Sequence, residues 1–183
     1  MPPQDIPNPV PTVAVNAFTA RDVAEILREK GWLLGDATSA QIAWCERAAV
    51  LLGPHVADRN SLGDLLHLIF HYDAREVLAK VESHSVLSRS GAREVLRHLA
   101  LLLLDGAPLT TDRFKEVVNS LKETLGLRSR ELFHPIRLAI AGRVGDGDLD
   151  RIILLLDEAA NLSFSVSVKS ARQRIVEFCA ALD

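Results

Sequence analysis

The chain has 183 residues, which is enough for one sizeable helical domain or for two small ones that share an interface. Hydrophobic residues make up 48% of it but aromatic residues only 5%, so the core must consist mainly of Leu, Ile, Val and Ala, which favours helix packing over a β-sandwich. The formal net charge of −3 excludes a uniformly basic nucleic-acid binder but is compatible with a local basic patch.

The N-terminal residues 1–17 are rich in proline, and we expect an extended, weakly ordered arm there rather than a signal peptide. The longest apolar run, 99–104, is too short to cross a membrane, so we expect a cytoplasmic protein without a membrane partner. Cys45 and Cys179 each lie among apolar residues, where reduced, buried thiols are the simplest expectation.

Apolar residues recur at helical spacing along most of the remaining chain. In the N-terminal half this spacing predicts helices over 19–30, 39–53, 61–70, 73–83 and 85–104. The predicted N-caps of the first four are Thr19, Ser39, Ser61 and Asp73.

In the C-terminal half the spacing predicts helices over 111–126, 129–142, 148–159 and 169–182. Pro135 is expected either to kink the second of these or to mark a fresh first turn. The alternating segment 163–168 is interpreted as an extended connector, with Phe164, Val166 and Val168 facing inwards.

The predicted fold is therefore all-α, a bundle or cage of about eight helices. We expect one helical domain over 18–183, and a division into 18–105 and 106–183 remains open.

None of the local signatures of a nucleophile, a P-loop or a dinucleotide site occurs in the sequence. The Gly/Asp-rich turn at 142–150 lacks the alternating acids and the closing Glu of a calcium loop. His67 and His71 are spaced for zinc on one helical face, but partly exposed histidines beside carboxylates are the more economical interpretation. We therefore predict no catalytic residues, metal, cofactor or small-molecule substrate.

The charges are unevenly distributed along the chain. Residues 89–143 hold ten basic residues against six acidic ones, a net charge of +4. Within this segment Arg89, Arg93 and Arg97 are spaced to form one basic ridge on a helix, which suits a phosphate backbone. A solvated helix face with incidental arginines explains the same pattern. Few aromatic residues are available to stack on bases, and the plausible exposed ones are Trp32, Phe70 and Tyr72, with Trp44 assigned to the core.

The segment 126–142, GLRSRELFHPIRLAIAG, resembles the C-terminal anticodon-binding region of bacterial-type glutamyl-tRNA synthetases. The family's Pro-hydrophobic-Arg-x-Ala-hydrophobic-small-Gly pattern is matched here by Pro135, Ile136, Arg137, Ala139, Ile140, Ala141 and Gly142. Flanking segments at 69–81, 110–127, 149–159 and 170–182 agree in order, and 163–168 looks like an insertion. The HIGH- and KMSKS-type signatures of the catalytic domain do not occur, so the likeness covers a free-standing helical domain without the ATP-using half.

The resemblance implies a non-catalytic domain that binds tRNA or another structured RNA. The predicted RNA-binding residues are Arg89, Arg93, Arg97, Arg128, Arg130 and Arg137. For Arg137 a buried structural ion pair is an equally good interpretation. The alternative function is a protein-interaction or regulatory relative of a synthetase domain, which docks on a synthetase or on another protein and does not bind RNA.

Overall fold

A computed structural model describes residues 18–183, and the predicted proline-rich arm 1–17 lies outside this range. The described chain is all-helical, as predicted, with ten α-helices where about eight were expected. They are α1 Ala20–Glu29, α2 Ser39–Leu52, α3 Arg59–Phe70, α4 Ala74–Ala79, α5 Val81–Leu87, α6 Ala92–Leu103, α7 Thr111–Leu125, α8 Ser129–Ala141, α9 Asp148–Ala160 and α10 Ala171–Leu182. None of the helices in this part of the chain is long and apolar enough to traverse a bilayer.

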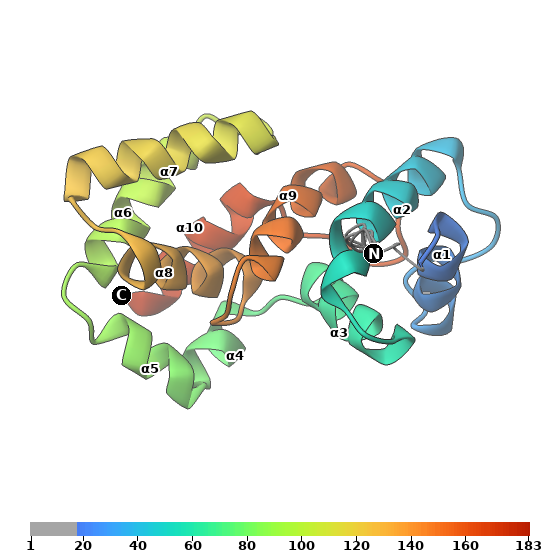
Figure 1. Ribbon diagram of the computed structural model, residues 1–183, viewed down its shortest axis with the longest axis horizontal. Coiled ribbons are helices and arrows are strands. Elements are labelled where there is room, and N and C mark those ends of the chain that lie inside the picture. The colour runs from blue at the N-terminus through green and yellow to red at the C-terminus, as the bar shows by residue number, and fades with distance from the viewer. Residues whose placement is uncertain (1–17) are drawn as a thin grey trace, which may run out of the picture.

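The helices form two groups that α9 connects (Figure 1). Helices α1, α2 and α3 lie at one end of the molecule, and α4 to α8 with α10 lie at the other. Helix α9 packs against α2 and α3 on one side and against α8 on the other. It is apolar around most of its circumference, as a helix buried on several sides must be. Helix α9 belongs to the C-terminal part of the chain and yet packs on the N-terminal helices. The division of the chain at residue 105 remains a prediction.

Side-chain caps fix most of the helix starts, in places one to three residues from the predicted cap. Thr19 and Ser170 cap α1 and α10 through reciprocal bonds with the third helical residue. Thr38, rather than the predicted Ser39, caps α2, and Thr110 caps α7, which begins at Thr111 as predicted. The predicted cap Ser61 is wrong by a larger margin: the carboxylate of Asp58 accepts from the Ser61 N–H, so α3 begins almost one turn earlier.

The predicted helices 73–83 and 85–104 are wrong in their bounds, because the chain breaks twice in this region. Lys80 adopts an extended conformation between α4 and α5, and the Ser83 hydroxyl donates to the Val77 carbonyl across the break. Gly91 then takes a left-handed φ of 85° and becomes the N-cap of α6. Arg89 therefore lies in a turn, not on α6.

Pro135 lies inside α8, at its seventh residue, and does not begin the helix. Proline removes one backbone N–H, so only the bond to the Glu131 carbonyl, in the first turn, is lost. Burial compensates for this loss, because Pro135, Ile136 and Ala139 all face the core. The motif around Pro135 thus forms one continuous helix that begins at Ser129.

The connector 163–168 is neither helix nor strand, and it ties the C-terminal part of the chain to the N-terminal helices. The Ser165 N–H donates to the Trp32 carbonyl at 2.9 Å, and the Gln41 amide donates to the Ser163 carbonyl at 3.0 Å. Phe164 packs edge-on against Trp44, with ring centres 5.4 Å apart.

The inward-facing pattern predicted for this connector is wrong at one position. Val168 is buried and Phe164 is half-buried, but Val166 is exposed. Within the described part of the chain no strand pairs with this segment, and the chain bends at 165–166, so the alternation of side chains is interrupted there.

Gly142 ends α8 with a φ of 79°, a conformation that side chains with a Cβ rarely adopt. We expect Gly142→Ala to lower the free energy of unfolding by about 1 kcal/mol. An added Cβ would make only ordinary contacts with Val77 and Tyr72, so backbone strain is the cause. Urea denaturation measures the loss. Gly147→Ala is the matched control, because φ is −65° there and no atom lies within 4 Å of the added Cβ. Equal losses in both variants would contradict this explanation.

Candidate nucleic-acid interface

Arg89 and the start of α8 are brought together by two adjacent turns. The turn that ends at Gly91 packs on Leu127, which lies in the loop before α8. The Arg89 guanidinium donates from Nη1 to Nδ1 of His134, at 2.9 Å. Since arginine only donates, this Nδ1 must accept, and the His134 ring is therefore neutral in this arrangement.

The surroundings of His134 are positively charged. Burial, followed by the charges of Arg89, Arg130 and Arg137, lowers the pKa of His134 below its usual value. Asp146 opposes this shift but contributes less. Burial is the larger cause of this shift, but the three arginines that add to it place positive charge around the first half of α8, although the whole chain is slightly acidic.

Arg128 and Arg130 stand at the exposed N-terminus of α8. Arg128 is the N-cap residue, and no side chain caps the first turn of this helix. Both arginines are exposed, and neither forms an ion pair within residues 18–183. Uncapped N–H groups and the helix dipole favour an anion at such a terminus, although Glu131 in the first turn offsets part of that charge.

Arg137 has partners for its whole guanidinium inside the protein. Nε and Nη2 donate to the two carboxylate oxygens of Asp150, at 2.8 and 3.0 Å, and Nη1 donates to the Gly145 carbonyl at 3.0 Å. The same group lies over the Phe133 ring, 4.7 Å from its centre. Only 12% of its side-chain surface is exposed. The sequence left two interpretations of Arg137 open, and the structure contains the buried ion pair. This ion pair with Asp150 fixes α8 against α9.

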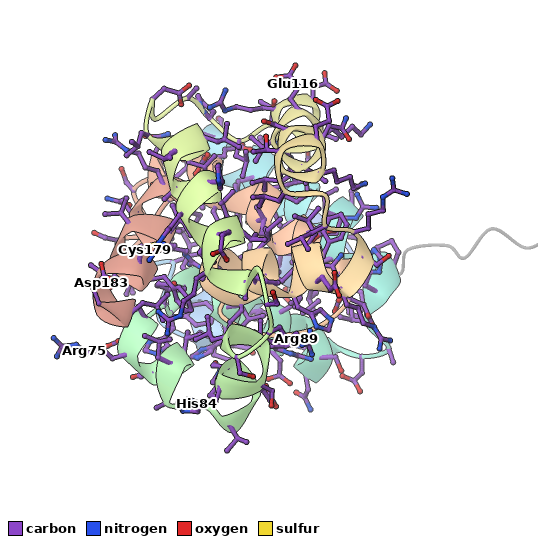
Figure 2. All side chains as sticks on the ribbon, turned by 90° about the vertical axis from the view of Figure 1, so that its left-hand side faces the viewer. Arg75, His84, Arg89, Glu116, Cys179 and Asp183 are labelled. Carbon is purple, nitrogen blue, oxygen red and sulfur yellow. The ribbon has the colours of Figure 1, made fainter. Side chains whose placement is uncertain are left out.

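Arg93 and Arg97 do share an exposed face of α6, but the predicted ridge with Arg89 is wrong. Because α6 begins only at Ala92, Arg89 points from the preceding turn toward α8. Arg93 and Arg97 instead line a shallow depression beside the end of α10, together with Cys179 and Asp183. Figure 2 shows Arg89 on the opposite side of this face from Cys179 and Asp183. The six predicted arginines therefore fall into three separate locations.

Arg174 is a residue that the sequence analysis missed, and it is the most heavily bonded arginine of the core. Its guanidinium donates to the carbonyls of Leu68, Ile69 and Ile140, at 2.7 to 3.0 Å, and to that of Lys169 at 3.1 Å. These bonds satisfy the C-terminal ends of α3 and α8. A signal was present in the sequence: Arg174 shares a helical face with Ala171, Ile175 and Phe178, all of which are buried.

The aromatic residues expected at the surface are not exposed. Trp32, Phe70 and Tyr72 are all buried, and Trp32 stacks on Phe70 with ring centres 4.7 Å apart. Phe133, on α8, is only partly buried. It is therefore the aromatic side chain near the cationic residues that retains access to solvent.

His67 and His71 stack on each other, with ring centres 5.2 Å apart, and His71 pairs with Glu76 at 2.7 Å. Both rings are exposed beside carboxylates. Within 18–183 no group of three or more His, Cys, Asp or Glu residues is arranged to hold a metal ion. Cys45 is buried, as predicted, and burial raises the pKa of its thiol to about 11, whereas Cys179 is only partly buried.

An all-helical cage with a cationic surface around one helix start is consistent with a nucleic-acid-binding domain. Sequence comparison identifies the family to which the chain belongs. A family model described as "Anticodon binding domain" matches residues 19–162, which span α1 to α9. The chain belongs to the anticodon-binding domain family.

The individual relatives agree with the resemblance predicted from 126–142. The chain is 26% identical over 123 residues to "Glutamate--tRNA ligase 2" of Syntrophus aciditrophicus (strain SB), which covers 67% of this chain and 25% of the relative. It is also 26% identical over 130 residues to "Glutamate--tRNA ligase" of Geobacillus stearothermophilus, covering 71% of this chain and 26% of the relative. The chain thus spans about a quarter of the length of these relatives. No solved structure matches it significantly.

Proposed function

We propose that this domain binds tRNA, or another structured RNA, through a cationic surface at the start of α8. We call this surface the α8 cationic cluster and define it as Arg89, Arg128 and Arg130. The observation that carries the proposal is that three exposed arginines lie at or beside the uncapped start of α8, and none of them has a carboxylate partner among the described residues. Membership of the anticodon-binding domain family supports RNA as the ligand.

The chemistry of the cluster suits a phosphate backbone. Guanidinium groups bind phosphate oxygens in two parallel hydrogen bonds, and free N–H groups at a helix N-terminus add further donors. Arg137 does not contact the RNA in this proposal, because Asp150 and Gly145 already occupy its donors. It acts as a positioning residue that holds α8 at a fixed angle to α9. Arg93 and Arg97 supply a second, separate cationic site on α6 for a longer ligand.

We further propose that the domain itself is not an enzyme. The family match covers an anticodon-binding domain, and the ligases named above are about four times as long as the matched segment. Amino-acid activation needs a site for ATP, and the sequence holds no nucleotide-binding signature. In this proposal the domain contributes affinity for tRNA, and any chemistry belongs to another protein or another domain.

A competition titration tests the proposal directly. A fluorescent unfractionated tRNA is bound to the purified chain at low salt, and unlabelled tRNA or DNA duplex of equal phosphate content is then added. We expect tRNA to compete at least about tenfold better than the duplex, since shape and unpaired loops contribute to RNA recognition. Equal competition by the duplex would reduce the binding to non-specific charge attraction and would overturn the proposal.

Binding of tRNA is expected to strengthen as the pH falls below 7 and through the lowered pKa of His134. In the free protein the pKa of His134 is lowered by burial and by three arginines, so the ring is neutral at pH 7. A phosphate bound at the cluster favours the protonated ring and raises that pKa, so RNA binding takes up a proton. A rise of one pKa unit on binding corresponds to about tenfold tighter binding at the acid end.

The control for this pH dependence is His134→Gln, which retains a hydrogen-bonding side chain but cannot titrate. We expect its affinity profile to be flatter than that of the unaltered chain, as measured by anisotropy at constant ionic strength. Identical profiles for the two proteins would show that His134 does not report phosphate binding at the cluster.

The second candidate function, docking on a synthetase or another protein, is favoured by one apolar surface. Leu101 and Leu104 near the end of α6 and Val176 on α10 are exposed, and Val176 also lines a groove of about 480 Å³ together with Leu103 and Pro108. Exposed apolar side chains around a groove are typical of protein contacts. Affinity purification with Leu101→Glu as the negative control tests this function: it requires a partner that the altered chain no longer captures.

A further inference from the structure

The exposed face of α6 carries two large apolar side chains near its end. Leu101 and Leu104, about one turn apart, are 64% and 48% exposed, whereas Leu99 and Leu103 of the same helix are buried in the core. Helix α10 packs beside α6, and its Val176 is 46% exposed. Apolar side chains that gather on one surface are typical of a protein contact. Since these side chains face solvent in the single chain, a second molecule can cover them.

Opposite charges flank Leu101 at equal spacing. Arg97 precedes it by four residues and Asp105 follows it by four, so each lies about one turn, roughly 6 Å, along the axis from Leu101 on a similar face. Arg97 is exposed and forms no ion pair within residues 18–183. The Asp105 carboxylate accepts from Nη2 of Arg113 at 2.8 Å, but 56% of its side chain stays exposed. It can therefore accept from a second guanidinium.

We propose that this face of α6 is the interface of a symmetric homodimer. Helix α6 of one copy lies antiparallel to α6 of a second copy, and the two-fold axis passes beside Leu101. In such a pair each residue meets the one that lies equally far on the other side of the axis. Leu101 therefore packs on Leu101 of the second copy. Arg97 lies opposite Asp105 of the second copy and the reverse, which gives two equivalent ion pairs around an apolar centre that Leu104 extends.

A second copy in this orientation suits the face better than other ligands do. A parallel pair in register would place Arg97 opposite Arg97 and Asp105 opposite Asp105, so that like charges repel. An RNA backbone would leave Leu101 and Leu104 without an apolar partner and would be repelled by Asp105. A different protein would need the same order of charges and leucines in reverse, which the chain itself already presents. The charge pattern of α6 is therefore complementary to itself.

The homodimer goes beyond the proposed function and does not depend on it. Arg97 lies beside the end of α10, together with Cys179 and Asp183, and Figure 2 shows Arg89 on the opposite side of this face from those two residues. The α8 cationic cluster therefore stays open in the dimer. Arg97 also belongs to the second cationic site proposed on α6, so a long RNA and a second copy compete for this one side chain.

Sedimentation velocity of the full chain tests the homodimer. An interface built on one helix pair belongs with the small ones below roughly 1,200 Å², so we expect a dissociation constant on the order of 100 µM. Arg97→Glu and Asp105→Arg should each weaken self-association at least about tenfold, because like charges then face each other. An equimolar mixture of the two variants should recover the original affinity, since both ion pairs regain opposite signs. Arg93→Glu is the matched control, because Arg93 is exposed one turn farther from the axis.

Disulfide trapping gives a second measurement that does not need Asp105→Arg to fold. Two cysteines beside a two-fold axis are close enough to join, so Leu101→Cys should form a covalent dimer in a glutathione redox buffer. The control is Leu34→Cys, at a leucine that is 74% exposed before α2. Both variants also carry Cys179→Ser, because Cys179 is only partly buried, whereas Cys45 is buried.

Three results would overturn the homodimer: a monomer at all concentrations up to about 500 µM, well above the expected dissociation constant, equal weakening by Arg97→Glu and Arg93→Glu, or Leu101→Cys joining no faster than Leu34→Cys. A chain that stays monomeric but loses a partner protein on Leu101→Glu assigns the face to a different protein, which also overturns the homodimer. None of these results bears on the competition between tRNA and duplex, so the homodimer and the proposed function fail separately.

Discussion

Replacing Arg174 by Met is expected to lower the free energy of unfolding by about 4 kcal/mol or more. The side chain is fully buried, and its guanidinium supplies the donors for the carbonyls of Leu68, Ile69 and Ile140. Methionine fills much of the volume but donates no hydrogen bond. A buried carbonyl that loses its partner costs about 1–3 kcal/mol, and three of them are involved. The expected loss is a large part of the 5–15 kcal/mol that is typical of a domain.

The size of this effect depends on how the charge is held. Among residues 18–183 no carboxylate forms an ion pair with Arg174; carbonyl oxygens and the ring of Tyr72, 4.6 Å from the guanidinium carbon, surround it. Burial lowers the pKa of Arg174 to about 10, so the group stays charged at neutral pH. Arg174→Lys keeps the charge but presents a single ammonium, which cannot reach carbonyls on two helices in the same geometry.

Urea denaturation of Arg174→Met, Arg174→Lys and the control Arg172→Met measures the effect. Arg172 is exposed on the same helix, and its replacement should change stability by no more than about 0.5 kcal/mol. The lysine variant should fall between the other two. If Arg174→Met and Arg172→Met unfold at the same urea concentration, the hydrogen bonds of Arg174 do not stabilise the junction of α3, α8 and α10.

Reversing the charge of the α8 cationic cluster, by changing Arg89, Arg128 and Arg130 together to Glu, is expected to weaken tRNA binding about 100-fold or more. Each exposed contact between a cation and a phosphate contributes up to about 1 kcal/mol, and three contacts would convert to roughly two orders of magnitude in affinity. Repulsion by the introduced carboxylates adds to the loss. Stability should change little, because all three side chains are exposed and form no ion pairs in the described structure.

The control for net charge is a second triple variant, in which Arg21, Arg75 and Arg172 become Glu. These arginines are exposed on α1, α4 and α10. Arg75 lies on the far side of the face from Arg89 in Figure 2. We expect less than a tenfold loss for the control in the same anisotropy titration. A comparable loss in both triple variants would mean that total charge, and not the cluster, governs affinity.

Helix positions could be predicted from the sequence wherever apolar spacing and a cap agree. For α7 and α9 the recurring apolar residues give the helix to within one residue at each end. The break at Lys80 could not be predicted this way, because the apolar spacing of 73–83 continues through it. Gly91 is a signal for the start of α6 that the sequence contains. The predicted helix 85–104 ran through this glycine and therefore placed Arg89 on the same helix as Arg93 and Arg97.

The partners of the arginines depend on tertiary packing, so local sequence patterns could not predict them. Arg137 and Asp150 lie on successive helices, and nothing in their spacing shows that the guanidinium and the carboxylate meet face to face. Arg89, Arg128 and Arg130 could be named as candidates from residue type and segment charge alone. The sequence could not tell that Arg89 lies beside α8 while Arg93 and Arg97 lie beside the end of α10, because that depends on how two turns pack.

Pro135 shows how burial can override a local preference. Proline favours the first turn of a helix, and that rule predicted a start or a kink. In α8 one backbone hydrogen bond is lost, while Pro135 and the following apolar residues pack into the core. The family motif is therefore mainly architecture, and its exposed beginning, at Arg128 and Arg130, is the part proposed to bind RNA.

The most direct test of RNA binding by the α8 cationic cluster is the salt dependence of tRNA affinity, measured by anisotropy for the unaltered chain and the Arg89/Arg128/Arg130 triple variant. The logarithm of the association constant should fall linearly with the logarithm of salt concentration for the unaltered chain. The slope should be shallower by about one for each phosphate contact removed in the variant. Equal slopes for the two proteins, or no measurable tRNA binding by the unaltered chain at low salt, would contradict the proposed function.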